Sequence, residues 1–254
     1  MTLLSVVTVC KDDIEGLRGT VSSYVAQDSS DTEQVMVVAP SADGSHELAL
    51  SFEGSNTRVF TLPAQGIYHA MNYGWQQAHG EWILFLNAGD FFATSESLKQ
   101  VTNFLRYKVT NEQMVLFGGI VSGSGINRIL IPKGRLTQWR FAYGFLKVIH
   151  PSVLMRRELI KEIGGFSEAM SIASDYDLII RALDYPTTTC ELQVTRFTPG
   201  GVSSSNASLA IQESRQVRMD ALNLKGIRGY LDYVWFSHIK IRVFLRSLLR
   251  GSRD

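Results

Sequence analysis

The turn Asn87-Ala88-Gly89-Asp90 carries side chains suited to holding a cation. It follows directly on residues 82–86, a continuous apolar run of the kind expected in a strand that is buried on both faces. In an open α/β sheet the ligand crevice lies beyond the carboxyl ends of the strands, so this turn would bring Asp90 to that crevice. Carboxylate and carbonyl oxygens, such as those of Asp90 and Asn87, are ligands that Mg²⁺ prefers. A polar turn after a buried strand is the alternative interpretation.

A second acidic stretch, Ser174-Asp175-Tyr176-Asp177, opens an apolar-periodic segment that predicts a helix. Ser174 is expected to be its N-cap, and the helix dipole favours Asp175 and Asp177 in the first turn. These two carboxylates therefore have at least a structural use.

The elements that must position these residues alternate between strand and helix. Between residues 66 and 79 apolar residues recur with the period of one helix face, and Gly80 then suits a left-handed helix end. Strands are expected at 3–9, 35–38, 58–61, 82–86, 115–118, 129–131, 153–155 and 188–197. The alternation predicts an α/β fold with a mixed, mostly parallel sheet flanked by helices.

Bulk composition excludes several classes of protein. The 254 residues carry a net charge of +1, so there is no general attraction to nucleic acid. Cys10 and Cys190 have no paired spacing and are interpreted as reduced thiols, which suits the cytoplasm. The N-terminus shows no signal-peptide pattern, and no apolar run is long enough to span a membrane.

The last segment differs from the rest. We expect one domain over residues 1–222, made of a first half over about 1–118 and a second half over about 119–222, and a basic amphipathic C-terminal helix over 223–254. Arg242, Arg246 and Arg250 recur at spacing four beside an apolar stripe. Such a helix suits an anionic membrane surface, or it packs on the domain or on a partner subunit.

The helix, strand and turn of residues 66–92 resemble family 2 glycosyltransferases, in particular bacterial enzymes of exopolysaccharide, O-antigen and colanic-acid assembly. The shared pattern is G-I-Y-x-A-M-N-x-G, then G-x, an apolar strand and N-x-G-D, and the resemblance covers roughly residues 3–205. It implies a GT-A fold and inverting transfer of a hexose-type sugar from a nucleoside diphosphate sugar. The implied acceptor is a growing glycan on a polyprenyl-diphosphate lipid, at the inner face of the cell membrane.

The resemblance also implies roles for individual residues. Asp90, with Asn87, would hold Mg²⁺ or Mn²⁺ against the pyrophosphate, and Asp175 would be the general base that takes the acceptor proton. Donor or acceptor contacts would come from Thr8, Asn72, His150 and Ser203, and from Asp43, the first acid after the second strand. Arg135, Arg140 and Lys147 would suit an acceptor diphosphate, or are simply solvated.

Two departures leave the nucleobase open. Lys11 and Asp12 stand where the family often has an aromatic residue followed by Asn, and Ala39-Pro40 stands where it has a nucleobase-binding Asp. A non-catalytic sugar-nucleotide-binding or scaffold protein is therefore an alternative, against which the retention of Asp90 and Asp175 argues. A sugar-nucleotide nucleotidyltransferase is less favoured, because residues 10–13 lack the glycine-rich loop that such enzymes have.

Overall fold

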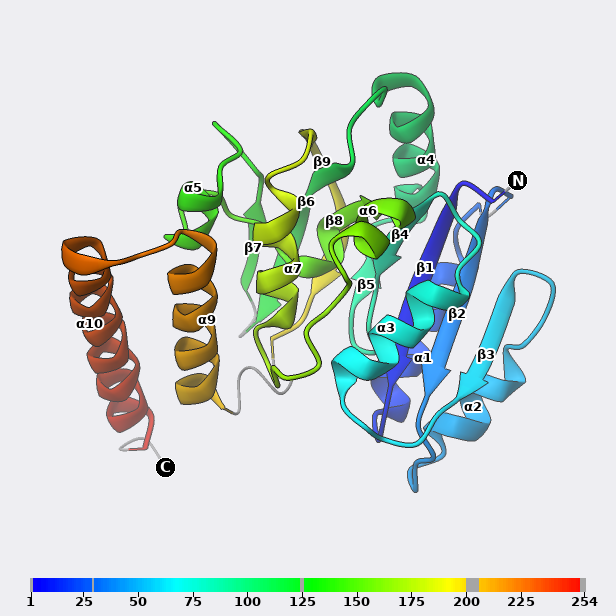
Figure 1. Ribbon diagram of the computed structural model, residues 1–254. Helices are drawn as coiled ribbons and strands as arrows, with labels where there is room; N and C mark the ends of the chain where they lie inside the picture. Colours follow the sequence, from blue (N-terminus) through cyan, green and yellow to red (C-terminus); the bar gives the residue numbers. More distant parts are fainter. Residues whose placement is uncertain (1, 29, 124–125, 200–205, 252–254) are drawn as a thin grey trace.

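The computed structural model describes residues 2–28, 30–123, 126–199 and 206–251, and it describes the side chains of the last helix as far as His238. The described chain forms a nine-stranded mixed sheet with helices on both faces (Figure 1). The strands are β1 Leu4–Cys10, β2 Thr32–Val38, β3 Thr57–Thr61, β4 Trp82–Phe85, β5 Phe91–Phe92, β6 Met114–Gly123, β7 Ile126–Leu130, β8 Val153–Arg156 and β9 Thr187–Phe197. Their order is β3-β2-β1-β4-β8-β6-β9-β5, and β7 pairs with β6.

The helices alternate with the strands as the sequence predicts. They are α1 Ile14–Val25, α2 Ser45–Ser51, α3 Ile67–Gln77, α4 Ser97–Lys108, α5 Gln138–Ala142, α6 Arg157–Glu162, α7 Ser174–Ala182, α9 Ala207–Ala221 and α10 Gly226–Gly251, with a 3₁₀ turn at His150–Ser152. The α/β prediction is thus confirmed, and the expected C-terminal helix is present as α10.

The first four long strands form a parallel unit around β1. Pairing of β1 with β2 and β4, and of β2 with β3, is parallel throughout, so all their carboxyl ends meet at one edge. All seven residues of β1 are buried, because α3 covers one face while α1 and α2 cover the other. Gly74 of α3 permits a close approach, since a Cβ there would lie 2.5 Å from Val7 Cγ1.

The second half of the sheet is mixed. Strand β8 is antiparallel to β4 and β6, whereas β9 runs parallel to β6. Helices α6 and α7 pack on the same face as α3, and their apolar side chains join one continuous core. This arrangement brings the start of α7 to the same sheet edge as the turn after β4.

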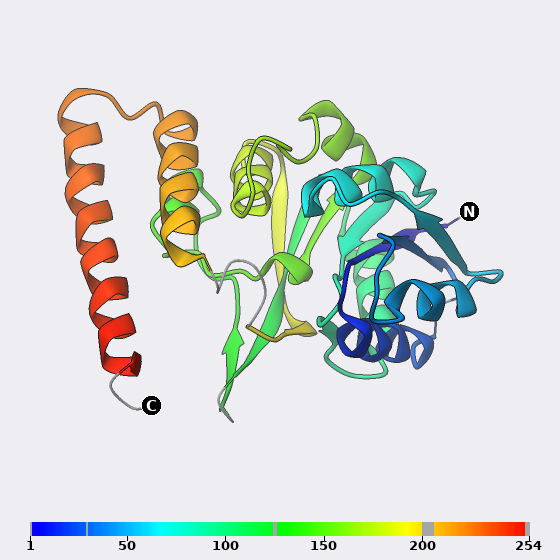
Figure 2. The ribbon, with the colours of Figure 1, turned by 90° about the horizontal axis from the view of Figure 1, so that it is seen from below.

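Helices α9 and α10 lie beside each other outside the sheet (Figure 2). A buried ion pair joins them: Asp232 of α10 lies 2.9 Å from Nε of Arg218 and 3.2 Å from Nε of Arg215. Within the described part of the chain, no helix is long and apolar enough to cross a bilayer.

Candidate active site

A cleft of about 1210 Å³ opens at the carboxyl ends of the parallel strands. Its walls come from the ends of β1 and β2, the start of α3, the turn after β4, the 3₁₀ turn and the start of α7. Asn87, Asp90, His150 and Asp175 all line it, so four predicted site residues share one cavity. Lys11 and Asp13 stand at the end of β1 in the same cleft.

The turn after β4 is held in one conformation by α1. Gly89 has φ of 90°, a left-handed conformation that a residue with a side chain rarely adopts. The buried hydroxyl of Thr20 accepts a hydrogen bond from Gly89 N at 3.0 Å and lies 2.8 Å from Asp90 O. Thr20 therefore fixes the backbone that presents Asp90. Sequence reasoning missed it, because a threonine on the inner face of a helix resembles core packing.

Asp90 is a buried carboxylate, with only 7% of its surface exposed. Burial raises its pKa from the ordinary 3.8 to about 7, although a backbone N–H of Asn87 partly opposes this rise. The side-chain Oδ1 of Asn87 is also buried and has no hydrogen-bond partner among the described residues. A bound cation would satisfy both groups, so the donor set fits a hard metal ion that takes its other ligands from substrate phosphates and water. Within the described residues, no cluster of three or more metal-binding side chains occurs.

Asp175 lies across the cleft in the first turn of α7. Its Oδ1 accepts a hydrogen bond from Tyr176 N at 2.8 Å and lies 3.4 Å from the Tyr68 hydroxyl. Burial, and then the charge of Asp175, raise the pKa of Tyr68, so its hydroxyl stays protonated and can donate. Tyr68 also bonds the Ile172 carbonyl. Sequence reasoning did not single out Tyr68, although it belongs to the G-I-Y motif that opens α3.

The prediction that Ser174 caps α7 is wrong. The N-cap is Ala173, which makes no side-chain cap, and the buried Ser174 hydroxyl has no hydrogen-bond partner in the part of the chain that the structure describes. Instead, the Glu213 carboxylate of α9 accepts hydrogen bonds from Ser171 N, Ile172 N and Ala173 N at 2.8–2.9 Å. Burial acts to raise the pKa of Glu213, but these three N–H groups outweigh it and hold the pKa below its ordinary value. A residue far along the chain thus anchors the segment that carries Asp175.

His150 lies in the wall of the same cleft. Its ring stacks on Phe85 with centroids 5.5 Å apart and meets Phe166 edge-on at 5.8 Å. Burial lowers its pKa, and the charge of Asp175 acts in the opposite direction. A neutral imidazole in this position can donate or accept a hydrogen bond within the cleft.

Three predicted site residues do not line the cleft. Thr8 is fully buried within β1, where its hydroxyl accepts from Gln34 Nε2 at 3.1 Å. The strand continues to Cys10, and its last two residues, Val9 and Cys10, line the cleft instead. Asp43 braces the neighbouring loops, because its oxygens accept from Ile14 N at 2.8 Å and Ser45 N at 3.0 Å.

Asn72 fixes a distant turn to α3. Its Nδ2 donates to Phe166 O at 3.0 Å and to Glu168, while its Oδ1 accepts from Phe166 N and from Trp75 Nε1. These bonds occupy the whole amide, so its contribution is to hold the region before α7. Ser203 lies outside the described residues.

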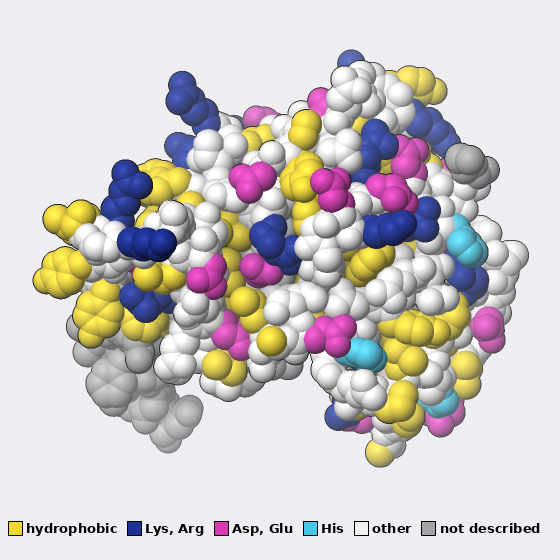
Figure 3. All heavy atoms as spheres, viewed as in Figure 1, with side chains coloured by type: hydrophobic (Ala, Val, Ile, Leu, Met, Phe, Trp, Pro, Cys, Tyr) yellow, Lys and Arg dark blue, Asp and Glu magenta, His cyan; other side chains and the backbone are white. Residues whose placement is uncertain are grey.

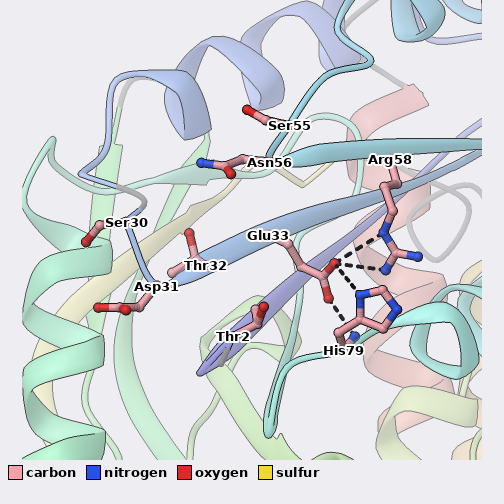
Figure 4. A pocket seen from close by; sticks show the side chains of 9 residues that line it. All are labelled: Thr2, Ser30, Asp31, Thr32, Glu33, Ser55, Asn56, Arg58 and His79. Carbon is pink, nitrogen blue, oxygen red and sulfur yellow. Dashed lines mark hydrogen bonds and ion pairs between the residues drawn. The ribbon is translucent and has the colours of Figure 1, made fainter.

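A smaller hollow of about 360 Å³ lies at the amino ends of β1, β2 and β3 (Figure 4). Its charged groups already satisfy one another: Glu33 accepts from Arg58 Nη2 at 2.8 Å and from His79 N and Ser5 Oγ at 2.6 Å. This network ties three strands to the end of α3. It lies at the sheet edge opposite the cleft, so we assign the active site to the cleft.

Comparison with known proteins agrees with this geometry. The family model described as glycosyl transferase family 2 matches residues 5–164. A PGL/p-HBAD biosynthesis glycosyltransferase of Mycobacterium bovis is 26% identical over 201 residues, which cover 75% of this chain and 71% of that protein. An uncharacterised glycosyltransferase of Mycobacterium tuberculosis is 28% identical over 180 residues, covering 70% and 68%.

Solved structures share the fold. S. aureus TarS 1-349 in complex with UDP-GlcNAc superposes with a TM-score of 0.72 at 19% identity, covering 87% of this chain and 65% of that one. A mannosyltransferase from Pyrobaculum calidifontis, in complex with GDP-Man and Mn²⁺, gives a TM-score of 0.65 at 15% identity, covering 88% and 64%. The chain thus spans just under two thirds of the length of these two structures. The match of the family model over residues 5–164 shows that this chain belongs to glycosyltransferase family 2, and the solved structures share its fold.

Proposed function

We propose that the protein is an inverting glycosyltransferase that moves a hexose-type sugar from a nucleoside diphosphate sugar to a glycan acceptor. The observation that carries the proposal is the placement of two acids in one cleft. Asp90 lies in the turn after a parallel strand, and Asp175 lies in the first turn of α7 on the other side. The nucleotide half, about residues 1–118, would bind the donor, and the acceptor half, about 119–222, would bind the acceptor.

The donor diphosphate would lie against the turn after β4. Asp90 and Asn87 would hold Mg²⁺ or Mn²⁺ there, and the ion would offset the negative charge of the leaving nucleoside diphosphate. The buried, unpartnered Asn87 Oδ1 and the raised pKa of Asp90 support this assignment. Structural neighbours that bind UDP-GlcNAc, or GDP-Man with Mn²⁺, are consistent with it.

Asp175 would act as the general base. Inversion requires the acceptor hydroxyl to lose its proton as it attacks the anomeric carbon from the face opposite the leaving group. Asp175 lines the cleft from α7, where Tyr176 N donates to its Oδ1 and the Tyr68 hydroxyl lies 3.4 Å away. Among the described residues, none donates a hydrogen bond to the other oxygen, Oδ2. This oxygen would take the proton.

The nucleobase end of the cleft is largely apolar. Val9, Val38, Ala39 and Leu62 line it, and Lys11, Asp13 and Glu15 are charged side chains in the same cleft. An apolar wall can stack a base without selecting one, because every base has an apolar face. We therefore leave the nucleobase unassigned and expect Lys11 to approach the donor phosphates.

The acceptor is proposed to be a glycan on a polyprenyl-diphosphate lipid in bacterial surface polysaccharide synthesis. The enzyme would then lie on the cytoplasmic face of the cell membrane as a peripheral protein. The motifs of residues 66–92 and the basic composition of residues 223–254 support this part of the proposal.

A panel of sugar nucleotides, screened by thermal shift with and without Mn²⁺, tests the donor assignment. A ligand at about 100 times its Kd should stabilise the protein by roughly 2.7 kcal/mol. We expect a metal-dependent rise in Tm with one UDP-, GDP- or TDP-sugar, and loss of the metal dependence in Asp90→Asn. A folded protein that responds to none of them would favour the non-catalytic alternative.

A further inference from the structure

The exposed face of α10 is apolar, which is the reverse of an ordinary surface helix. Ile227, Tyr230, Leu231 and Val234 recur at i, i+3, i+4 and i+7, and between 49% and 76% of each residue is exposed. The opposite face packs on α9 through the buried Asp232 and its ion pairs with Arg215 and Arg218. The orientation of α10 is therefore fixed by charges on the inside, and it turns its apolar stripe outward.

A second exposed apolar group continues this surface from the glycosyltransferase domain. Trp139 of α5 and Phe145, just after this helix, are 54% and 57% exposed, and their rings stack with centroids 5.3 Å apart. Tyr143 lies 5.5 Å from Trp139 and 5.3 Å from Trp235 of α10. Its hydroxyl donates to Asp232 at 3.2 Å. An unbroken row of aromatic rings thus joins α5 to α10.

Charged residues of the two segments that carry this surface are positive except for the buried Asp232, whereas the neighbouring α9 also carries the exposed acid Asp220. Residues 134–157 contain no Asp or Glu, and Arg135 and Lys147 are exposed there. Residues 226–251 contain one acid, the buried Asp232, against five Lys and Arg residues. Figure 3 shows hydrophobic and basic side chains together over the upper part of α10. Apolar, tyrosine and tryptophan side chains mixed with basic ones are typical of surfaces that lie in the headgroup region of an anionic bilayer.

We propose that the exposed face of α10 and the Trp139–Phe145 pair form one docking surface for an anionic lipid bilayer. This deepens the proposed function, because it names the surface that meets the membrane in which a lipid-linked acceptor would lie. Positive charge on both segments attracts anionic headgroups, and the apolar stripe enters the interface beneath them. A second copy of this chain would bring the same positive charges together, which disfavours self-association through this surface.

The docking surface is connected to the cleft through one layer of side chains. Phe141 of α5 stacks on Tyr176 of α7 with centroids 5.1 Å apart, and the Tyr176 hydroxyl donates to Ala142 O at 3.2 Å. Tyr176 follows Asp175 directly. A bilayer bound at α5 would therefore lie next to the helix that presents the proposed base, where an acceptor headgroup needs to arrive.

Co-sedimentation with vesicles tests the proposal on the full chain. Vesicles of phosphatidylcholine mixed with phosphatidylglycerol are compared with vesicles of phosphatidylcholine alone, at low and at high salt. We expect binding to the anionic vesicles, weakened by salt. Arg228→Glu reverses a positive charge at the surface, and Leu231→Glu places a negative charge within the apolar stripe, so each should reduce the partition coefficient by about tenfold or more. Tyr107→Glu is the matched control, because Tyr107 is 75% exposed on the distant α4.

Three outcomes would overturn the proposal. One is equal binding of the wild type to both kinds of vesicle, and another is equal loss in Tyr107→Glu and Leu231→Glu. The third is a dimer in size-exclusion chromatography that Leu231→Glu dissociates, without any vesicle binding by the wild type. Thermal shift with sugar nucleotides on the same proteins distinguishes failure of the docking proposal from failure of the proposed function. If no protein binds a donor, the wild type included, the proposed function is refuted, while the vesicle result stands.

Discussion

Replacing Asp90 by Asn should stabilise the metal-free protein at alkaline pH. Burial raises the pKa of Asp90 from 3.8 to about 7, so the folded state keeps a proton that the unfolded state releases. Stability from this group is therefore greatest in acid and falls as the pH rises from about 4 to about 7. At about 1.4 kcal/mol per pH unit, the charged carboxylate costs the apo protein roughly 4 kcal/mol above pH 7, and roughly 2–3 kcal/mol of that develops between about pH 5 and about pH 8.

Urea denaturation with a chelator present measures this directly. The difference in the free energy of unfolding between Asp90→Asn and the wild type should grow by roughly 2–3 kcal/mol from about pH 5 to about pH 8. Adding Mn²⁺ should stabilise the wild type more at the higher pH, because the ligand must lose its proton first, and should leave the variant almost unchanged. Asp184→Asn is the control, because it makes the same change from carboxylate to amide at an exposed position.

The same pH dependence in Asp90→Asn and in the wild type would refute the reasoning. Equal stabilisation of both proteins by Mn²⁺ would remove Asp90 from the metal site.

Three further substitutions test how the site is held. Gly89→Ala places a side chain at φ of 90° and should cost about 1–2 kcal/mol of stability and weaken donor binding, measured by urea denaturation and thermal shift. Thr20→Val removes a buried hydroxyl that bonds Gly89 N, and should cost about 1–3 kcal/mol and reduce metal-dependent donor binding. Glu213→Gln keeps the shape but weakens the charge-assisted bonds to residues 171–173, so kcat should fall while the donor KM stays near the wild-type value.

Each of these variants has a matched control. Gly164→Ala creates similar strain, at φ of 83°, in open space away from the cleft, so it should lower stability without changing donor binding. Thr102→Val removes a hydroxyl that bonds only its own helix at Lys99 O. Glu158→Gln changes an exposed carboxylate. If a control changes donor binding or kcat as much as its partner does, the local role assigned to the partner is wrong.

The fold and half of the site follow from the sequence because they depend on short-range patterns. Apolar runs and helix periodicity placed β1, β2, β3, β4 and α3, and the turn after β4 followed from the end of its strand. Thr8 shows the limit of such reasoning. The strand continues one residue beyond its expected end at Val9, and the Thr8 hydroxyl lies inside the sheet, where it accepts a hydrogen bond from Gln34.

The remaining features depend on contacts between distant parts of the chain. Thr20 reaches a turn 69 residues further along, and Glu213 reaches back 40 residues to Ala173. Neither lies in a local motif that marks it. The stripe of α10 was visible in the sequence, but which way it faces depends on the Asp232 ion pairs, and those exist only once α9 and α10 are packed together.

The most direct test of the account measures sugar-nucleotide turnover and donor binding together in the wild type and Asp175→Asn. Asp177→Asn is the control, because Asp177 pairs with Arg181 at 2.7 Å and does not line the cleft. We predict that Asp175→Asn lowers kcat by about 10²–10⁴-fold while the donor-induced rise in Tm persists. Turnover at the wild-type rate in Asp175→Asn, with donor binding intact, would contradict the assignment of Asp175 as the base.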